Sequence, residues 1–576
     1  DLWIISKVTR RAIMKIFFLN FILLLSIMNG REGYFLNPII SGAHPDPSIC
    51  RAGDDYYIVN SSFEYFPGLP IHHSKDLVNW KLIGHGLHRE DQCNGNMNLV
   101  DVQSDGGIHA PTIRYHKGTF YIITTNVYNS GDGKPGLMRN FIITAKNPAG
   151  PWSDPYIIEG APGIDPDIFF DSNGKVYFTG THSPGDMNSN GIGEIWIQEL
   201  DIKNWKLIGE RRTVWDGIFG CCTEGPHIYK ENGLYYLLVA EGGTGKNHAV
   251  MIAASENIFG PYIENQRNPI LTTRHVTNEY FVNSTGHADI IELKDGRWYM
   301  VSLGKRNDLD GDANMGRETY LIPMVWESTI VKWAQVSDTK WEPVRYLFPV
   351  PAPLTGKVER FTTLPFPDKP QYVNNSFIDD FSTNYLGLDW TFIRVPQKKT
   401  FSLENKSGFL RLFSKPNKIE DRKRFSMIGF RQRETDFDYE VRMEYYPTDD
   451  KVESGIIHYQ KEWNYMTNTV YKVGKKFYLE QKLKEKNKDV VTLKKVILKN
   501  YDGSIILRVT SKKDKYDFYF SLDEGKNFNY YTTVDAIKML DRNYTGALLG
   551  FFSSSNGKKS NDYADYDWVR YNDYIR

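Results

Sequence analysis

Five residues that can donate or accept protons stand at one phase of a repeat in this sequence: Asp46, His109, Asp165, Glu224 and His287. Each lies eleven or twelve residues before a tyrosine that ends a copy of the repeat. If the repeats surround one axis, equivalent side chains meet at one end of that axis. Three carboxylates and two imidazoles gathered there would form a site for proton-transfer chemistry.

The repeat that would position them is a short apolar stretch, a tight polar turn and an aromatic pair. It returns five times and ends at Tyr57, Tyr121, Tyr177, Tyr236 and Tyr299. Turns such as Asn-Gly and Asp-Gly tolerate positive φ, so each copy is predicted to be a β-hairpin. Spacings of 56 to 64 residues favour a radial array over a solenoid. We therefore predict a five-bladed β-propeller over residues 36–348.

Each of the five polar residues has an ordinary explanation when taken alone. An Asp before Pro is usually a turn former, and a lone Glu usually lies in solvent. Five such residues at one phase of a repeat favour the functional interpretation.

The rest of the chain predicts a second β domain. Residues 349–371 are proline-rich and lack alternation, as is typical of a linker. From residue 372 to 576, nine short segments alternate apolar and polar residues, which predicts a β-sandwich. The fold class is therefore all-β, a propeller followed by a C-terminal sandwich.

Residues 14–29 read MKIFFLNFILLLSIMN, a lysine followed by an apolar run that is short for a membrane span. This pattern is typical of a secretory signal, so residues 1–30 are predicted to be a signal peptide region. An exported chain would be periplasmic or secreted. The alternative is a buried N-terminal helix.

Composition excludes some classes of protein. Lysine plus arginine equals aspartate plus glutamate, so the formal net charge is zero, which argues against nucleic acid as a partner. The four cysteines include no CxxC pair, which argues against a structural zinc site. Cys221 and Cys222 are adjacent, and we favour two buried thiols over a vicinal disulfide.

Three stretches resemble glycoside hydrolase family 43, and within it the two-domain β-xylosidases and α-L-arabinofuranosidases: NPIISGAHPDPSICRAGDDYYIVNSSFEYFPG, TEGPHIY and GRETYL. The resemblance covers nearly the whole chain after residue 36 and implies a five-bladed propeller and an inverting mechanism. It implies that Asp46 is the general base and Glu224 the general acid. Asp165 would orient that acid and tune its pKa.

The chemistry of inversion fits these roles. One protonated carboxyl must donate to the leaving oxygen while an ionised one activates water, with roughly 6.5–9.5 Å between them. Glu224 should therefore have a raised pKa, through burial and a negative Asp165. Asp46 should stay ionised through hydration or hydrogen bonds.

The same resemblance implies that Arg317 binds the sugar and that His287 lies near the axis. Phe63, Tyr65 and Phe66 would wall the pocket. From the spacing alone, a surface salt bridge with Glu318 or another acid is the favoured interpretation of Arg317, and the three aromatic residues could equally be ordinary propeller core. Many family β-xylosidases carry a W-A-P motif where this chain has IHAP, with His109 in the tryptophan position. This departure favours an arabinofuranosyl substrate. His109 could donate a hydrogen bond to a sugar hydroxyl, or it could equally be an inner-strand histidine whose hydrogen bonds are satisfied within the protein.

No cofactor is expected to be required. Structural calcium is a candidate, near His287 or in the sandwich through Asp379, Asp380 and Asp565. The predicted function is an exo-acting, inverting glycosidase that releases terminal pentoses from hemicellulose oligosaccharides. The alternatives are a β-D-xylosidase proper, an endo-arabinanase and a non-catalytic carbohydrate-binding propeller.

Overall fold

The computed structural model describes residues 33–128, 137–218, 221–373, 375–450 and 452–574, and within them the chain is all-β. The short helical segments are the 3-10 helices η1 (Glu90–Gln92), η2 (Gly95–Asn98), η3 (Ile419–Asp421) and η4 (Ala536–Met539). The predicted signal region, residues 1–30, lies outside the described residues. In the part that is described, no helix has the length and apolar character needed to cross a membrane.

Five antiparallel sheets follow one another along the described chain from residue 48 to 351. The first sheet contains β2 (Ser48–Ala52), β3 (Asp55–Val59), β5 (Gly68–Ser74) and β6 (Lys81–Leu87). The second contains β7 (Gly107–His116), β8 (Thr119–Tyr128), β9 (Leu137–Ala145) and β10 (Tyr156–Ile157). The third contains β11 (Asp167–Phe170), β12 (Val176–His182), β13 (Glu194–Asp201) and β14 (Lys206–Trp215). The last two contain β15 (Glu224–Glu231), β16 (Leu234–Glu241), β17 (Ala249–Ser255), β18 (Ile263–Glu264) and β19 (Leu271–Thr272); and β20 (Val282–Glu292), β21 (Trp298–Arg306), β22 (Arg317–Ser337) and β23 (Lys340–Pro351).

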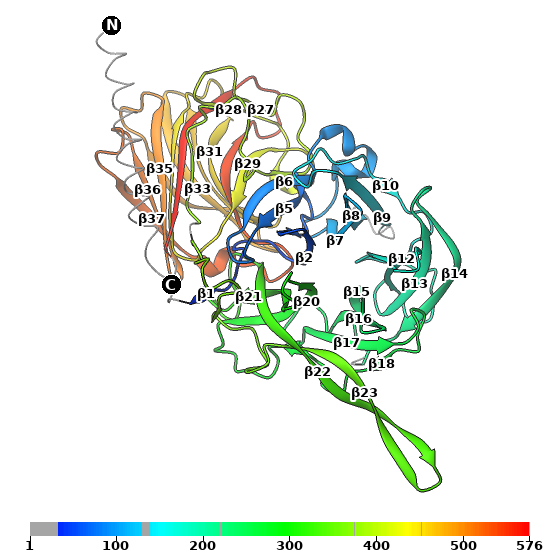
Figure 1. The fold of residues 1–576 in the computed structure, drawn as a ribbon. Helices are drawn as coiled ribbons and strands as arrows, with labels where there is room; N and C mark the ends of the chain where they lie inside the picture. The colour runs from blue at the N-terminus through cyan, green and yellow to red at the C-terminus, as the bar shows by residue number, and fades with distance from the viewer. Residues whose placement is uncertain (1–32, 129–136, 219–220, 374, 451, 575–576) are drawn as a thin grey trace.

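These sheets surround a common centre, with β2, β7, β15 and β20 facing it and β14 at the rim (Figure 1). The predicted hairpins form the inner half of each sheet, as in β15 and β16, where Tyr229 pairs with Tyr236. Asn232 and Gly233 make that turn with φ of 50° and 81°, values that these two residue types tolerate. The β22–β23 hairpin projects away from the sheets (Figure 1).

A buried polar network joins the first strands of all five sheets. Arg114 on β7 donates to Asp167 on β11 at 2.8 Å and to Asp289 on β20 at 3.0 Å. Ser48 on β2 donates to Asp289 at 2.6 Å, and the Tyr229 hydroxyl on β15 donates to the same carboxylate. Both aspartates are fully buried, so the charges compensate one another inside the protein. The network fixes the first strands around one point.

Two further sheets make up the C-terminal part of the described chain, as the alternation predicted. One contains β25 (Phe377–Asp379), β27 (Phe401–Ser402), β28 (Leu410–Phe413), β30 (Phe437–Glu444), β35 (Ser504–Lys512), β36 (Lys515–Ser521), β37 (Asn529–Asp535) and β39 (Tyr563–Asp573). The other contains β29 (Ser426–Arg431), β31 (Glu453–Lys461), β32 (Asn464–Val473), β33 (Lys476–Lys484), β34 (Val491–Ile497) and β38 (Leu548–Ser554). Side chains such as Tyr439, Val441, Phe551 and Tyr566 form a common core between them.

Two small sheets connect the halves of the chain. β1 (Tyr34–Leu36) pairs with β24 (Phe361–Thr363), a strand inside the stretch predicted as a linker. β4 (Tyr65–Phe66) pairs with β26 (Phe392–Ile393) from the C-terminal part. The β4–β26 pairing holds the C-terminal part against the first sheets, close in sequence to Phe63.

Candidate active site

A cavity of about 400 Å³ opens where the first strands of the five sheets begin. Its volume is in the range of small-molecule sites. The structure brings most of the residues singled out from the sequence for catalysis or substrate binding to its wall, namely Asp46, Phe63, His109, Asp165, Glu224, His287 and Arg317. Tyr65 and Phe66, also suggested as wall residues, instead lie buried in hydrophobic core clusters. These residues are up to 271 positions apart in sequence, as for Asp46 and Arg317.

The equivalent position of each repeat has an unusual backbone. Asp46, Ala110, Asp165, Gly225 and His287 all have positive φ, from 27° to 59°. Residues with a side chain occupy this region at a cost in free energy, which is typical of functional sites. The equivalence inferred from the sequence was therefore wrong by one residue in two repeats, because Glu224 and His109 directly precede this position. Register shifts lie at this position in β7, in β15 and also in β20.

Asp46 is a buried carboxylate with three polar neighbours. Ser61 donates to its Oδ2 at 2.5 Å, Arg317 donates to its Oδ1 at 3.0 Å, and His287 Nδ1 lies 3.7 Å from Oδ1. Burial alone would raise the pKa of Asp46, but Arg317, His287 and the Ser61 hydrogen bond together bring it below its ordinary value. Asp46 is therefore ionised at neutral pH and able to accept a proton.

Glu224 has the opposite electrostatic character. Burial is the main cause that raises its pKa to about 7, the charge of Asp46 is the second, and Arg317 opposes both. The sequence predicted that burial and the charge of Asp165 would raise this pKa. The contribution of burial is confirmed, but the charge that raises the pKa is that of Asp46. Glu224 retains its proton over much of the range in which Asp46 is ionised.

Asp165 is buried, and its Oδ2 accepts a hydrogen bond from the Gly225 amide at 3.1 Å. Burial, Glu224 and Asp46 raise its pKa well above the ordinary value. Because Asp165 and Glu224 interact, their protons belong to the pair, and the pair retains a proton near neutral pH. The Gly225 hydrogen bond ties Asp165 to the residue that follows Glu224.

Arg317 links the carboxylates to the aromatic wall. Its Nε donates to the carbonyl oxygen of Tyr544 at 3.1 Å, and its guanidinium lies 5.6 Å from the Phe63 ring centroid. The alternative partner, Glu318, instead pairs with Arg306 through bonds of 2.7 and 2.8 Å. Arg317 is nearly buried, so its fork of donors is held at the pocket rather than in solvent.

His109 lies against Phe63, with ring centroids 4.8 Å apart in an edge-to-face arrangement. Its Nε2 is 2.9 Å from the carbonyl oxygen of Asp105, so Nε2 carries the hydrogen and donates. Burial lowers its pKa to about 4, so the ring is neutral at pH 7 and Nδ1 is an acceptor. Of the two alternatives for His109, the structure therefore favours the histidine whose donor is satisfied within the protein, because its N–H already bonds the Asp105 carbonyl.

His287 packs on Gly225, where an added Cβ would lie 3.2 Å from the imidazole ring. Burial lowers the pKa of His287 to about 4. A neutral His287 beside Asp46 leaves Arg317 as the main charge that stabilises the base. The absence of a side chain at Gly225 is what permits this packing.

Tyr544 is a wall residue that the sequence did not reveal. It comes from the sandwich, between η4 and β38, and its ring stacks on Phe63 at 6.0 Å. The Arg317 guanidinium lies 5.0 Å from the Tyr544 ring centroid. Residues 541–546 read DRNYTG, an ordinary polar loop, and no signal in the sequence connects it with a pocket more than 200 residues earlier.

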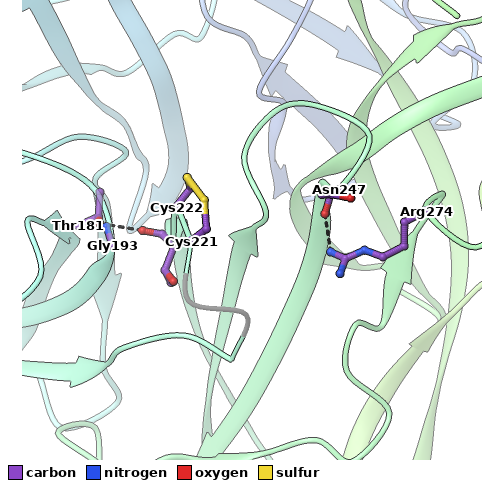
Figure 2. Close-up of a disulfide and its surroundings, with 7 residues drawn as sticks. Thr181, Gly193, Cys221, Cys222, Asn247 and Arg274 are labelled. Atoms are coloured by element: carbon purple, nitrogen blue, oxygen red, sulfur yellow. Dashed lines mark hydrogen bonds between the residues drawn. A yellow bond between two sulfur atoms is a disulfide. The ribbon is translucent and has the colours of Figure 1, made fainter.

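Cys221 and Cys222 form a vicinal disulfide, and Cys222 lines the pocket two residues before Glu224 (Figure 2). The favoured prediction of two buried thiols was wrong, since Cys221 is exposed. Cys50 and Cys93 are the free cysteines of the described chain, and both are buried.

The carboxylates suggested for calcium have protein partners. Asp379 accepts from the Trp390 indole at 2.8 Å, Asp380 accepts from the Ser382 amide at 3.2 Å, and Asp565 pairs with Arg411 at 2.8 and 3.0 Å. In the described ranges, no group of three or more His, Cys, Asp or Glu is arranged to hold a metal ion.

Comparisons with known proteins agree with this geometry. The model of "Glycosyl hydrolases family 43" matches residues 35–329, and that of "Beta xylosidase C-terminal Concanavalin A-like domain" matches residues 378–572. A xylosidase/arabinosidase of Butyrivibrio fibrisolvens is 37% identical over 552 residues, 92% of this chain and 98% of the relative. A non-reducing end alpha-L-arabinofuranosidase of Bacteroides ovatus is 37% identical over 544 residues, 93% and 94% of the two chains.

Solved structures match over the same length. The GH43B protein of a Bacteroides ovatus xyloglucan locus has a TM-score of 0.82 at 34% identity, covering 94% of this chain and all of its own. A xylan beta-1,4-xylosidase of Bacillus halodurans has a TM-score of 0.82 at 29% identity, with the same coverage. Both domains, the pocket and the full-length matches lead to one conclusion: this chain belongs to glycosyl hydrolase family 43.

Proposed function

We propose that this protein is an exo-acting, inverting glycosidase that releases terminal α-L-arabinofuranosyl groups from hemicellulose oligosaccharides. The observation that carries the proposal is that one pocket combines a carboxylate with a lowered pKa, Asp46, and a carboxyl with a raised pKa, Glu224. Inverting hydrolysis needs this pair of an ionised base and a protonated acid.

In this mechanism Asp46 removes a proton from water as the water attacks the anomeric carbon. Glu224 donates its proton to the leaving oxygen on the other face of the sugar. Asp165, bonded to the Gly225 amide, holds the acid in place and shares its titration. Arg317 keeps Asp46 ionised and offers its remaining donors to sugar hydroxyls.

The choice of pentose rests on His109. A neutral imidazole with a free acceptor nitrogen replaces the flat tryptophan of many family β-xylosidases, and this favours a furanose ring. The second candidate is a β-D-xylosidase, because relatives of both names match along the whole chain. A non-catalytic carbohydrate-binding role would leave the divergent pKa values of Asp46 and Glu224 without a purpose.

The test is hydrolysis of nitrophenyl α-L-arabinofuranoside and β-D-xyloside, with kcat/KM measured for both. We expect the arabinofuranoside to be the better substrate, and proton NMR to detect the inverted anomer of the released sugar first. Product analysis on arabinan should give monosaccharide only. Absence of turnover on every pentoside would favour the binding role, and longer products would favour an endo-arabinanase.

We further propose a five-bladed propeller as the catalytic domain, over residues 36–348. The five sheets around a common centre and the polar network that joins their first strands support it (Figure 1). We propose export to the periplasm or the medium through residues 1–30, which fractionation of cells expressing the full chain would test. We propose that no cofactor is required, so activity and Tm should be unchanged by EDTA or added calcium.

A further inference from the structure

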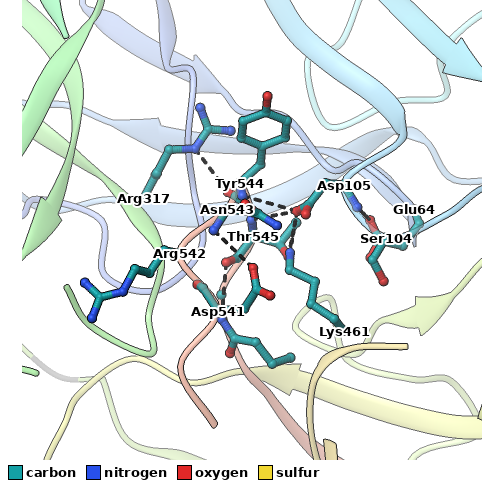
Figure 3. Close-up of polar contacts among 12 residues, drawn as sticks. Glu64, Ser104, Asp105, Arg317, Lys461, Asp541, Arg542, Asn543, Tyr544 and Thr545 are labelled. Atoms are coloured by element: carbon teal, nitrogen blue, oxygen red, sulfur yellow. Dashed lines mark hydrogen bonds and ion pairs between the residues drawn. The ribbon is translucent and has the colours of Figure 1, made fainter. Parts of the chain in front are cut away.

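We propose that Asp105, clamped by Lys461 of the sandwich, is a positioning residue that sets the sugar-binding wall of the pocket. Through one carboxylate oxygen it fixes the loop that carries Tyr544 (Figure 3). Through its backbone carbonyl it fixes His109. This inference rests on the proposed function, because it assigns a role within the same site. It concerns two residues that neither transfer a proton nor contact the scissile bond.

The clamp is a buried ion pair that crosses between the two domains. Lys461, the last residue of β31, is fully buried, and its ammonium group donates to Asp105 Oδ1 and to the Thr545 hydroxyl. The Asp105 side chain is 10% exposed. Such a pair is strongly disturbed when one partner is removed, because the other charge stays buried without compensation.

The side chain of Asp105 acts on Arg317 through the loop that carries Tyr544. Asp105 Oδ1 also accepts hydrogen bonds from the backbone amides of Tyr544 at 3.2 Å and Thr545 at 3.3 Å. With the loop fixed in this way, the carbonyl oxygen of Tyr544 accepts from Arg317 Nε at 3.1 Å. Arg317 is thereby held where its Nη1 bonds Asp46 at 3.0 Å.

The backbone of Asp105 acts directly on His109. The carbonyl oxygen of Asp105 accepts from His109 Nε2 at 2.9 Å, which orients the ring and leaves Nδ1 as the acceptor. The amide of Asp105 donates to Glu64 Oε2 at 3.2 Å, so the residue is held at its backbone as well as at its side chain. Lys461, Glu64 and Arg317 are the charged groups that act on Asp105 or face it.

The geometry gives the clamp a chemical consequence. If Asp105 loses its charge or Lys461 is removed, the Tyr544 loop loses its anchor and Arg317 loses the carbonyl that orients it. The guanidinium then no longer holds its place beside Asp46, and the pKa of Asp46 rises. Sugar binding and the protonation of the base should change together.

The experiment compares Asp105→Asn and Lys461→Met with the unmodified full chain on nitrophenyl arabinofuranoside. We expect kcat/KM to fall by roughly 10- to 100-fold, mainly through KM, since displacement of positioning groups by about 1 Å costs this much. The acid limb of the kcat/KM pH profile should move to higher pH. Lys461→Arg, which keeps the charge, should recover most of the loss.

Lys423→Met is the matched control. Lys423 of the sandwich also pairs with an aspartate of the first domain, Asp101, but neither residue lines the pocket. Its activity and pH profile should equal those of the parent. Circular dichroism and gel filtration check that each variant is folded. If Lys461→Met does not fold, Asp105→Asn alone tests the inference, because asparagine keeps the size of the side chain and one acceptor oxygen.

Two results would overturn the inference, and they can be told apart. An active parent whose Asp105→Asn variant keeps the parental KM and acid limb would remove Asp105 from the pocket while leaving the proposed function intact. A parent without activity on any pentoside would overturn the proposed function, and this inference with it.

Discussion

Replacing Glu224 by glutamine tests the assignment of the general acid. A rise in its pKa from 4.5 to about 7 disfavours ionisation by roughly 3 kcal/mol. At pH 6 about nine-tenths of the groups would be protonated, whereas an unperturbed glutamate would be about 3% protonated. The basic limb of kcat/KM in the parent should therefore lie near pH 7, with activity falling as pH rises through that value. The acid limb should lie below 3.8, the ordinary value for Asp46.

Glu224→Gln should remove that basic limb, because no acid remains to lose its proton. For a nitrophenyl or natural leaving group kcat should fall by about 10²- to 10⁴-fold, the usual contribution of a general acid. A dinitrophenyl pentoside, whose leaving group needs little protonation, should lose much less. Rates are measured from pH 3 to 9 on both aryl substrates.

Glu231→Gln is the matched control, since Glu231 ends the same strand, β15, outside the pocket. It should leave both limbs in place. A Glu224→Gln variant that keeps its limb near pH 7, or loses equal activity on both leaving groups, would refute the assignment.

Three further predictions concern the fold, the specificity and the cysteines. Arg306 is buried between Glu318 of its own sheet and Glu434 of the sandwich, so Arg306→Met should reduce the free energy of unfolding by about 3–5 kcal/mol, measured by urea denaturation. An equal effect from Lys423→Met, an exposed ion pair, would contradict this explanation. His109→Trp should raise the ratio of xyloside to arabinofuranoside kcat/KM, and an unchanged ratio would show that this position does not select the sugar. Thiol titration of the denatured, unreduced protein should detect two thiols per chain, Cys50 and Cys93, and four would exclude the Cys221–Cys222 disulfide.

The repeat made much of this site predictable. Asp46, Asp165 and Glu224 could be grouped from one sequence because five hairpins of similar length place the start of each first strand at the same level. The one-residue offset of Glu224 was not predictable, since the local strand irregularity at this position leaves no mark in the residue types.

The sequence also could not predict which residues far apart in the chain contact one another. Tyr544 lines the pocket and Lys461 bonds Asp105 because the sandwich packs against the first sheets, and the neighbours of these two residues in sequence give no sign of it. The Cys221–Cys222 bond depends on local geometry in the same way. The Arg114 network was missed because its members read as ordinary strand residues until the first strands are brought together.

That network also limits how sugars can travel. Ser48, Asp167 and Asp289 stand two residues after Asp46, Asp165 and His287 in the chain, and they join Arg114 near the centre through hydrogen bonds and ion pairs. A polysaccharide therefore does not pass along this axis, as fits an exo-acting enzyme whose pocket receives a chain end. The released monosaccharide has to leave the pocket through the same opening by which the sugar entered, and the shortened polymer still occupies that opening. The remaining chain must leave first, so each encounter should trim one residue, and accumulated monosaccharide should act as a competitive inhibitor.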